Sequence, residues 1–476
     1  MSKPSEPMSV ADPGASAMPR NQLVLMVTAL VLSVVTFGLN ASMVSPAYFD
    51  INTTLGDGAF VAMSTYFYLA GAIANVVLVR WSDYIGRKRV LVGVLMVLII
   101  GTLLVIFGSS LWVVVVGRFL QGISNVTFGI AFLILRARVS GATFGMCCGV
   151  ISSVNGGVAG GDALLGGIMV DKWGFRSIFV LILVVGVIAL AFAWKAVPDD
   201  NPADRAPGRM DWVGAALISV TVGGLNLFFS AGGHDGWVSP TALIWVGITV
   251  AAFIALLAFE RRLEHPLMAL KHMGTREAWP LLVVTIMVMG SFMVVLGFII
   301  PALAEDPDSG FGHDATMAAL LFITPAAVIQ LFMAPLIGRI AMRIGFVTML
   351  RIGIAFATVV TALLSMVAEQ EHLVMAAMVL FGIGFATLMT AMASLGVLQA
   401  SDEEPGALPG IANACYGIGS SVGFAWAGPI VGSGTDSTFA HAFWICVGIG
   451  AVAFVFSLIL KPKPLHVGHE PAALAH

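Results

Sequence analysis

Two full charges, Arg118 and Asp162, lie inside long apolar stretches of the sequence. A charge at the centre of a membrane costs about 2.5–3.5 kcal/mol on insertion scales, so each is expected to face a partner or a wet cavity. Neighbouring spans run antiparallel, which places Arg118 roughly 10 Å and Asp162 roughly 9 Å from the same membrane surface. Similar depth predicts an ion pair. The pair either switches when Asp162 binds a proton or only fixes the packing of two helices.

The composition is that of a membrane protein. Of 476 residues, 59% are hydrophobic and only 10% are charged, whereas soluble proteins carry roughly 25% charged residues. The net charge of −3 gives no basic face that could follow nucleic acid phosphates. All four cysteines lie in apolar stretches, where a thiol packs as a small core residue, so they do not indicate a redox compartment.

The apolar stretches predict an all-α integral membrane protein with fourteen transmembrane helices. A helix of about 20 residues crosses a bilayer because it satisfies its own backbone polar groups. The predicted spans are 22–44, 59–79, 90–109, 111–135, 143–168, 176–195, 211–231, 240–259, 279–303, 316–336, 347–367, 372–398, 409–432 and 439–460.

The basic residues predict the orientation of these spans. Twenty of the 23 Lys and Arg residues fall before the first span or after an even-numbered one, whereas Lys172 and Arg176 fall on the other side. Short loops rich in Lys and Arg stay cytoplasmic. We therefore expect a multi-pass protein of the plasma membrane with both termini, 1–21 and 461–476, as cytoplasmic tails. The first tail lacks the pattern of a cleavable signal peptide and is typical of a flexible segment.

Two cytoplasmic linkers divide the chain. A Pro- and Asp-rich stretch follows the sixth span, and a second linker from Glu260 to Arg276 follows the eighth. The division predicts a six-helix bundle over 22–195, linkers with an inserted helix pair over 196–276, and a second six-helix bundle over 277–460. The segment Arg80–Val90 is weakly repeated at Gly338–Gly345, in the equivalent loop of the second bundle. Repeated halves around a midplane site are typical of secondary transporters.

The loop after the second span carries the most specific motif. Asp83, Gly86, Arg87 and Lys88 match the pattern G-x-L-A-D-R-x-G-R-K, although Val79 and Tyr84 replace its first Gly and first Arg. On this motif and the span count, the chain resembles the major facilitator superfamily, and in particular its fourteen-helix drug:H⁺ antiporters. In that family the loop latches the cytoplasmic side in the outward-facing state. The alternative is that its basic residues only set the orientation.

Two further motifs extend the resemblance. Arg118, Gln121 and Gly122 fit the R-x-x-Q-G pattern that the family associates with proton transfer. The fifth span resembles the glycine-rich antiporter pattern, with Ala163 in place of its Pro and Asp162 in place of a Gly. Its glycines either have a specific mechanistic role or simply allow close helix packing. They are Gly156, Gly157, Gly160, Gly161, Gly166 and Gly167.

The first span departs from the family at Asn40, where an Asp is common. Since Asn40 cannot titrate, we expect that the acid has moved to Asp162. Other uncharged polar residues in spans, including Asn125 and Asn155 together with Asn75, Asn226 and Gln330, either line a cavity or form hydrogen bonds between helices. In the thirteenth span, Asn413 and its neighbouring glycines resemble the family's packing face.

The resemblance implies proton-coupled efflux of small amphipathic compounds by alternating access. A facilitator or importer of a small metabolite without proton coupling is the first alternative, and a transporter-like sensor is the second. No phosphate-binding loop, metal cluster or nucleophile–base pair is recognisable in the sequence. We expect no cofactor besides the proton gradient, no enzymatic activity, no nucleic acid partner, and a monomer that binds a small-molecule substrate within the lipid bilayer.

Overall fold

The computed structural model describes residues 19–139, 147, 150–151, 161–200, 210–260, 273–400, 407–432 and 438–463. Within these ranges the regular structure is helical and no strand occurs. In chain order the first helices are α1 (Arg20–Ser42), α2 (Tyr48–Leu55), α3 (Ala59–Ile85), α4 (Arg87–Phe107), α5 (Leu111–Gly122), α6 (Val126–Arg138) and α8 (Arg176–Ala196), with a further helix over 161–173. Short 3₁₀ turns occur at Ser45–Ala47 and Ile123–Asn125.

The second part of the chain begins with a helix pair, α9 (Trp212–Asp235) and α10 (Pro240–Glu260). It continues with α12 (Trp279–Val288), α13 (Ile300–Glu305), α14 (Ala315–Ala318), α15 (Thr324–Ile344), α16 (Phe346–Val367), α17 (Glu371–Leu398), α18 (Ala407–Val431) and α19 (Thr438–Ile459). Single-turn π-helical segments, Met289–Met293, Val295–Ile299 and Ala319–Ile323, interrupt two of the long helices. We call the helices before residue 200 the N-terminal group and those after residue 273 the C-terminal group.

Twelve of the described helices are long and apolar enough to cross a membrane. The predicted total of fourteen is not confirmed. The span predicted at 143–168 is described only from residue 161 onward. The span predicted at 409–432 is the helix α18, which is not among the twelve. Its sequence contains five glycines, two serines and two prolines, which lower its hydropathy.

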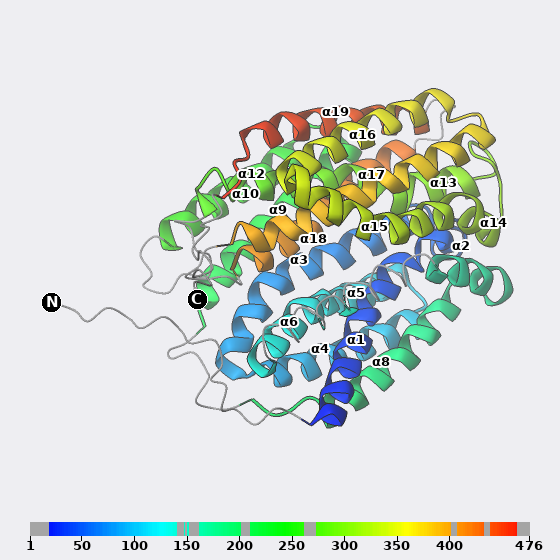
Figure 1. Cartoon of the computed structure of the whole chain (residues 1–476). Coiled ribbons are helices and arrows are strands. Elements are labelled where there is room, and N and C mark those ends of the chain that lie inside the picture. The colour runs from blue at the N-terminus through cyan, green and yellow to red at the C-terminus, as the bar shows by residue number, and fades with distance from the viewer. Residues whose placement is uncertain are drawn as a thin grey trace, which may run out of the picture.

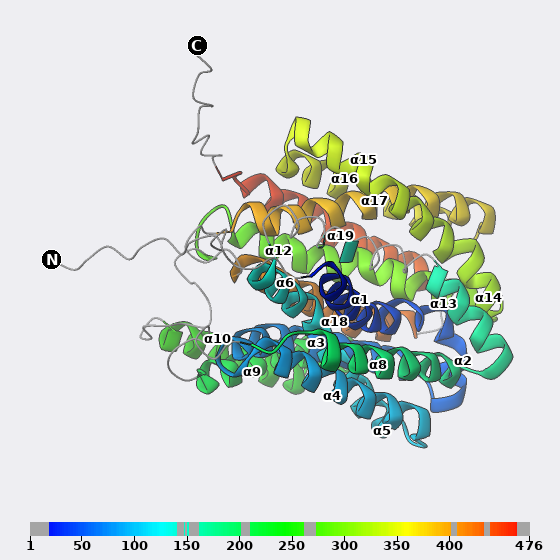
Figure 2. The same ribbon diagram turned by 60° about the horizontal axis from the view of Figure 1, so that its bottom comes forward.

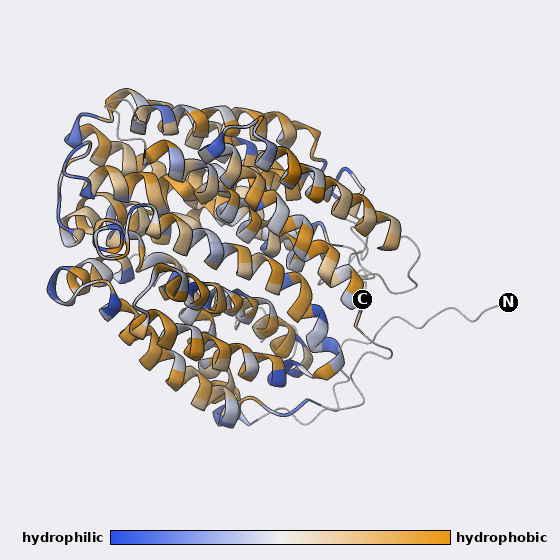
Figure 3. Cartoon of the chain, turned by 180° about the vertical axis from the view of Figure 1, so that it is seen from behind, coloured by the Kyte–Doolittle hydropathy of each residue, from blue (hydrophilic) through white to orange (hydrophobic). Residues whose placement is uncertain are grey.

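The helices lie side by side and share one long axis (Figure 1). The first described residues of α1 and the end of α19 lie at one end of the molecule, which we call the terminal end. Helices α2, α13 and α14 lie at the opposite end, the distal end (Figure 1). The helices are mainly hydrophobic along their length, while hydrophilic residues gather toward the two ends of the molecule (Figure 3). Phe107 and Phe332, for example, are 79% and 68% exposed, as expected where lipid covers the surface.

The two groups meet along α3 and α18, with α9 packed beside them (Figure 2). The close approach of α18 to α3 depends on glycine. A Cβ at Gly417 would lie 2.9 Å from the carbonyl oxygen of Tyr68, which shows how little space separates the two backbones. One buried apolar cluster runs across this seam and contains Phe60 and Phe67 of the N-terminal group with Phe298 and Phe424 of the C-terminal group.

The motif loop after the second span is shorter than the sequence indicates. Helix α3 continues to Ile85 and α4 begins at Arg87, so Gly86 alone interrupts the two helices. Its φ of 108° lies in the left-handed region, which glycine adopts without a steric penalty. The chain can therefore reverse direction within a single residue.

Candidate functional site

Arg118 is buried on α5, about two turns from the first residue of this helix, with 2% of its surface exposed. Its Nη1 donates to Asn40 Oδ1 at 3.0 Å and to Gln121 Oε1 at 3.0 Å, and its Nη2 donates to the Asn40 carbonyl oxygen at 3.2 Å. The guanidinium carbon lies 4.2 Å above the ring of Phe67 and 5.5 Å from that of Phe179. Amide oxygens and aromatic faces, which are uncharged, thus surround this cation.

The predicted ion pair between Arg118 and Asp162 is wrong. In the described part of the chain, the guanidinium forms no ion pair with a carboxylate within 4.0 Å. Asp162 Oδ2 instead accepts a hydrogen bond from the Ser42 hydroxyl, and its Oδ1 is buried without a partner. Both residues contact the last turn of α1, but at different positions: Asn40 accepts from Arg118, and Ser42 donates to Asp162. The helix that carries Asp162 also extends to residue 173, past the predicted end at 168, so Asp162 lies farther from the distal end than predicted.

A polar chain connects Arg118 to α4. Gln121 Nε2 donates to Thr102 Oγ1 at 2.9 Å, and both residues are fully buried. The R-x-x-Q-G motif therefore places Arg118 and Gln121 in one hydrogen-bond network. Gly122, its last residue, serves a different purpose, since a Cβ there would lie 2.0 Å from the Phe67 carbonyl oxygen. This glycine allows α5 to pack directly on the backbone of α3.

Asparagines from three helices gather around the middle of α3. Asn413 Nδ2 of α18 donates to Asn75 Oδ1 of α3 across the seam, at 3.5 Å. Asn125 approaches α3 one turn away from Asn75, where a Cβ built on Gly71 would lie 3.1 Å from its side chain. Asn75 and Asn125 are buried and Asn413 is half-buried. Of the residues predicted to border a cavity, Asn155 lies outside the described residues.

Two aromatic residues, Phe67 and Tyr68, lie about two turns from Asn75 on α3. Tyr68 stacks on Phe424 with ring centroids 5.6 Å apart, and Phe67 stacks on Phe37 at 5.4 Å. Toward the distal end, Tyr48 lies against Phe60 and Phe298. Burial raises the pKa of Tyr48 to about 12, and the negative charges of Asp306 and Glu305 act in the same direction. The Tyr48 hydroxyl therefore stays neutral at physiological pH.

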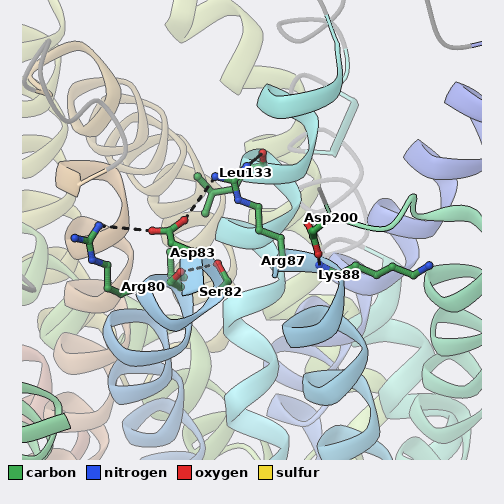
Figure 4. Close-up of polar contacts among 8 residues, drawn as sticks. Arg80, Ser82, Asp83, Arg87, Lys88, Leu133 and Asp200 are labelled. Atoms are coloured by element: carbon green, nitrogen blue, oxygen red, sulfur yellow. Dashed lines mark hydrogen bonds and ion pairs between the residues drawn. The ribbon is translucent and has the colours of Figure 1, made fainter. Parts of the chain in front are cut away.

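The motif loop at the terminal end forms the ion pairs shown in Figure 4. Asp83 lies 3.6 Å from both Arg80 and Arg87, and Arg87 Nη1 donates to the Leu133 carbonyl oxygen at 2.9 Å (Figure 4). Asp83 of α3 therefore pairs with the first residue of α4, across the break at Gly86. Whether the loop acts as a gate stays a prediction.

Two acids that the sequence analysis did not single out complete this loop. Asp200 Oδ2 accepts from the backbone nitrogen of Lys88 at 2.9 Å, which caps the N-terminus of α4 (Figure 4). Lys88 Nζ pairs with Asp199 at 2.8 Å, and this hydrogen bond and charge lower the pKa of Asp199. Both acids lie just after α8, at the start of the Pro-rich linker. These two adjacent acids were the sequence feature from which their contact with the motif loop could have been predicted.

The glycines predicted to pack the fifth span are described only in part, since Gly156, Gly157 and Gly160 lie outside the described residues. A Cβ on Gly166 would lie 2.5 Å from the Met43 carbonyl oxygen, and one on Gly167 would lie 2.5 Å from that of Ala315. A Cβ on Gly161 would meet no other atom within 4 Å. Two of these glycines therefore permit backbone contact, one of them with the C-terminal group.

Comparison with known proteins identifies the fold and the family. The family model of the Major Facilitator Superfamily matches residues 30–424 and 281–476, so the chain belongs to this superfamily of transporters. It is 30% identical over 84% of its length to the uridine/deoxyuridine transporter of Lactococcus lactis subsp. cremoris, of which it covers 86%.

Two other relatives are more distant. The chain is 25% identical over 91% of its length to the quinolone resistance protein NorB of Staphylococcus aureus, of which it covers 95%. It shares the fold of the xylose transporter XylE from E. coli in a partially occluded inward open conformation, with a TM-score of 0.64 and 14% identity over 93% of this chain and 99% of that one.

Proposed function

We propose that this protein is a secondary transporter of the cell membrane that carries pyrimidine nucleosides such as uridine. The observation that carries the proposal is the 30% identity to a uridine/deoxyuridine transporter over most of both chains. The terminal end faces the cytoplasm, as the distribution of Lys and Arg requires. Transport proceeds by alternating access of the N-terminal and C-terminal groups, which move as two halves around a site near the membrane midplane.

The residues around the middle of α3 fit this substrate class. A nucleoside is uncharged at neutral pH, and it presents a flat ring together with hydrogen-bond donors and acceptors. The amides of Asn75, Asn125 and Asn413 each offer a donor and an acceptor, and the ring of Tyr68, which stacks on Phe424, lies about two turns from Asn75 on α3. No charged side chain is needed to bind such a solute.

Uptake of radiolabelled uridine into proteoliposomes tests this proposal. We expect saturable uptake, with the KM raised at least about tenfold in Asn75→Ala and in Asn413→Ala. A good hydrogen bond contributes about 1 kcal/mol, and each variant loses the donor and the acceptor of one amide as well as the packing of that side chain. Asn226→Ala is the matched control, because its amide bonds Ser421 at 2.7 Å on the side of the α9–α10 pair. Absence of uridine uptake by the wild-type protein would refute the substrate assignment.

A proton gradient supplies the energy, and Asp162 carries the proton. Its Oδ2 is held by Ser42 while its Oδ1 has no partner, so a proton added at Oδ1 disturbs no existing bond. We expect Asp162→Asn to abolish accumulation of uridine driven by a pH gradient but to retain exchange of labelled for unlabelled uridine. Asp57→Asn, an exposed acid between α2 and α3, is the control. Gradient-driven accumulation in Asp162→Asn equal to wild type would remove Asp162 from the coupling mechanism.

Proton-coupled efflux of amphipathic drugs is the second candidate, because NorB is similar over 91% of this chain. The two candidates predict different results in cells. A nucleoside carrier increases uridine uptake and leaves drug tolerance unchanged, whereas an exporter raises the inhibitory concentration of quinolones and leaves uridine uptake unchanged. The same pair of assays detects a sensor, which changes neither.

A further inference from the structure

A carboxylate of the N-terminal group caps a helix of the C-terminal group at the distal end. Asp171, near the end of the 161–173 helix, accepts hydrogen bonds from the backbone nitrogens of Ala315, at 3.1 Å, and Thr316, at 2.8 Å, as well as from the Thr316 hydroxyl. Helix α14 begins at Ala315 and continues into α15 as a single span. Its first N–H groups have no partner within the helix and form the positive end of its dipole.

A second carboxylate makes the same type of contact in the opposite direction. Glu305, the last residue of α13 in the C-terminal group, accepts from the backbone nitrogen of Phe49 at 2.8 Å. Phe49 is the second residue of α2, in the N-terminal group. Each group therefore supplies one acid that caps one helix N-terminus of the other. Ser45 Oγ also donates to the Gly297 carbonyl oxygen at 3.1 Å, so the two groups are bound together throughout this region.

The sequence around Asp171 repeats the construction of the motif loop at the other end of the molecule. Asp83 is followed by Gly86 and Arg87, and Asp171 by Gly174 and Arg176. Both glycines have a positive φ, 108° at Gly86 and 75° at Gly174. Arg87 donates to the Leu133 carbonyl oxygen near the end of α6, and Arg176 Nη2 donates to the Gly108 carbonyl oxygen at the end of α4. In both loops the arginine anchors the turn to its own group.

The two aspartates differ in what they contact. Asp83 lies 3.6 Å from Arg80 and from Arg87, both in its own group. Asp171 instead reaches across to the C-terminal group. We propose that Asp171 and Glu305 form a reciprocal latch that holds the distal end closed, as the counterpart of the Asp83 loop at the terminal end. The latch rests on the alternating access in the proposed function, and it does not depend on the substrate.

Distances between spin labels on the full-length protein in lipid nanodiscs test the latch without any substrate. In a background with the four native cysteines replaced, labels at Thr54→Cys and Asp308→Cys report on the distal end, because both positions are exposed. Labels at the exposed positions Arg89→Cys and Met342→Cys report on the terminal end. We expect Asp171→Asn with Glu305→Gln to raise the ratio of open to closed distal ends about tenfold, while the terminal-end distance shortens.

Asp50→Asn is the matched control. Asp50 Oδ2 accepts from the backbone nitrogen of Phe175 at 2.7 Å, so this acid also caps a helix at the distal end, but within the N-terminal group. Thr316→Val removes one donor to Asp171 and keeps the shape of the side chain, so it is expected to cause a smaller shift in the same direction even if the double variant does not fold. Unchanged distal distances in Thr316→Val and Asp171→Asn, or an equal shift in Asp50→Asn, would overturn the latch. If the wild-type protein does not transport uridine but the latch variants still show the expected shift in distal distances, only the proposed substrate is refuted.

Discussion

At the scale of single residues, the most informative feature is how Arg118 is accommodated without a counter-charge. A buried guanidinium usually needs a carboxylate, because its desolvation is expensive. Here the oxygens of Asn40 and Gln121 accept its hydrogen bonds, and the faces of Phe67 and Phe179 provide cation–π contacts, which strengthen when water is excluded. Asn40 makes two of these hydrogen bonds, through its side chain and its carbonyl oxygen.

Asn40→Ala is therefore expected to destabilise the protein by about 1–3 kcal/mol, because it leaves a donor of a buried charged group without an acceptor. Thermal unfolding in detergent, followed by size-exclusion chromatography, measures the loss. Asn75→Ala is the control, since the Asn75 amide donates to the Gly71 carbonyl oxygen of its own helix and accepts only one long bond from Asn413. Equal loss of stability in the two variants would show that Asn40 has no special role in holding Arg118.

The sequence predicted the partners of Arg118 only in part. Counting residues along each helix predicted that Arg118 and Asp162 lie at similar depth, and both contact the last turn of α1. Each residue also turns by about 100° around the helix axis, and the rotation of each helix is set by packing contacts that no residue count contains. Gln121 was recognised through its motif, and Asn40 only as a departure from the family. Ser42, which holds Asp162, gave no signal of its own.

At the scale of elements, glycine decides which helices approach most closely. Gly101 and Gly117 face each other between α4 and α5, where a Cβ on either would lie 2.6 or 2.7 Å from the carbonyl oxygen of the other. Gly122 brings α5 against α3 in the same way. Close backbone contacts through small residues are a main source of helix association in membranes, where apolar side chains gain little by leaving lipid.

We expect Gly122→Ala to destabilise the protein by about 1–3 kcal/mol, as overpacking of a tight core does, and to lower transport. The added methyl group would lie 2.0 Å from the Phe67 carbonyl oxygen, so α3 and α5 would have to move apart. Gly161→Ala adds the same atoms where nothing lies within 4 Å, and it is expected to have little effect. Thermal unfolding and uridine uptake would check both variants. A Gly122→Ala protein as stable as Gly161→Ala would contradict the close approach.

The elements were the part of the structure most accessible from the sequence. Runs of apolar residues predicted the positions of the twelve described helices that are long and apolar enough to cross a membrane, because a helix in lipid must be both. The ends were less accurate. Helix α3 continues to Ile85, past the predicted end at residue 79, because a helix that leaves the membrane can remain helical through polar residues such as Arg80 and Asp83. Hydropathy marks where lipid ends, and not where the helix ends.

At the scale of the whole molecule, the α9–α10 pair is attached where the two groups meet. Asn226 Nδ2 of α9 donates to Ser421 Oγ of α18 at 2.7 Å, and Ser421 Oγ donates in turn to the Thr65 carbonyl oxygen of α3 at 3.0 Å. One buried hydroxyl therefore joins three helices, one from each part of the chain. Leu69 and Ala72 of α3 share an apolar cluster with Ile218 and Val222 of α9. The pair is thus placed to brace this seam.

If the seam between α9 and α18 acts as a fixed brace while the distal end opens and closes, cross-links at the two places should have opposite effects. A disulfide between Asn226→Cys and Ser421→Cys joins side chains that already lie within hydrogen-bond distance, and we expect transport to remain above about half of the reduced value. A disulfide between Ser45→Cys and Gly297→Cys ties the distal ends of the two groups, and we expect it to stop transport until a reductant is added.

Uridine exchange before and after reduction measures both effects in the cysteine-free background. Transport by the protein cross-linked between positions 45 and 297 would show that the distal end need not open. Inhibition of the protein cross-linked between positions 226 and 421 would show that α9 moves relative to α18 during the cycle.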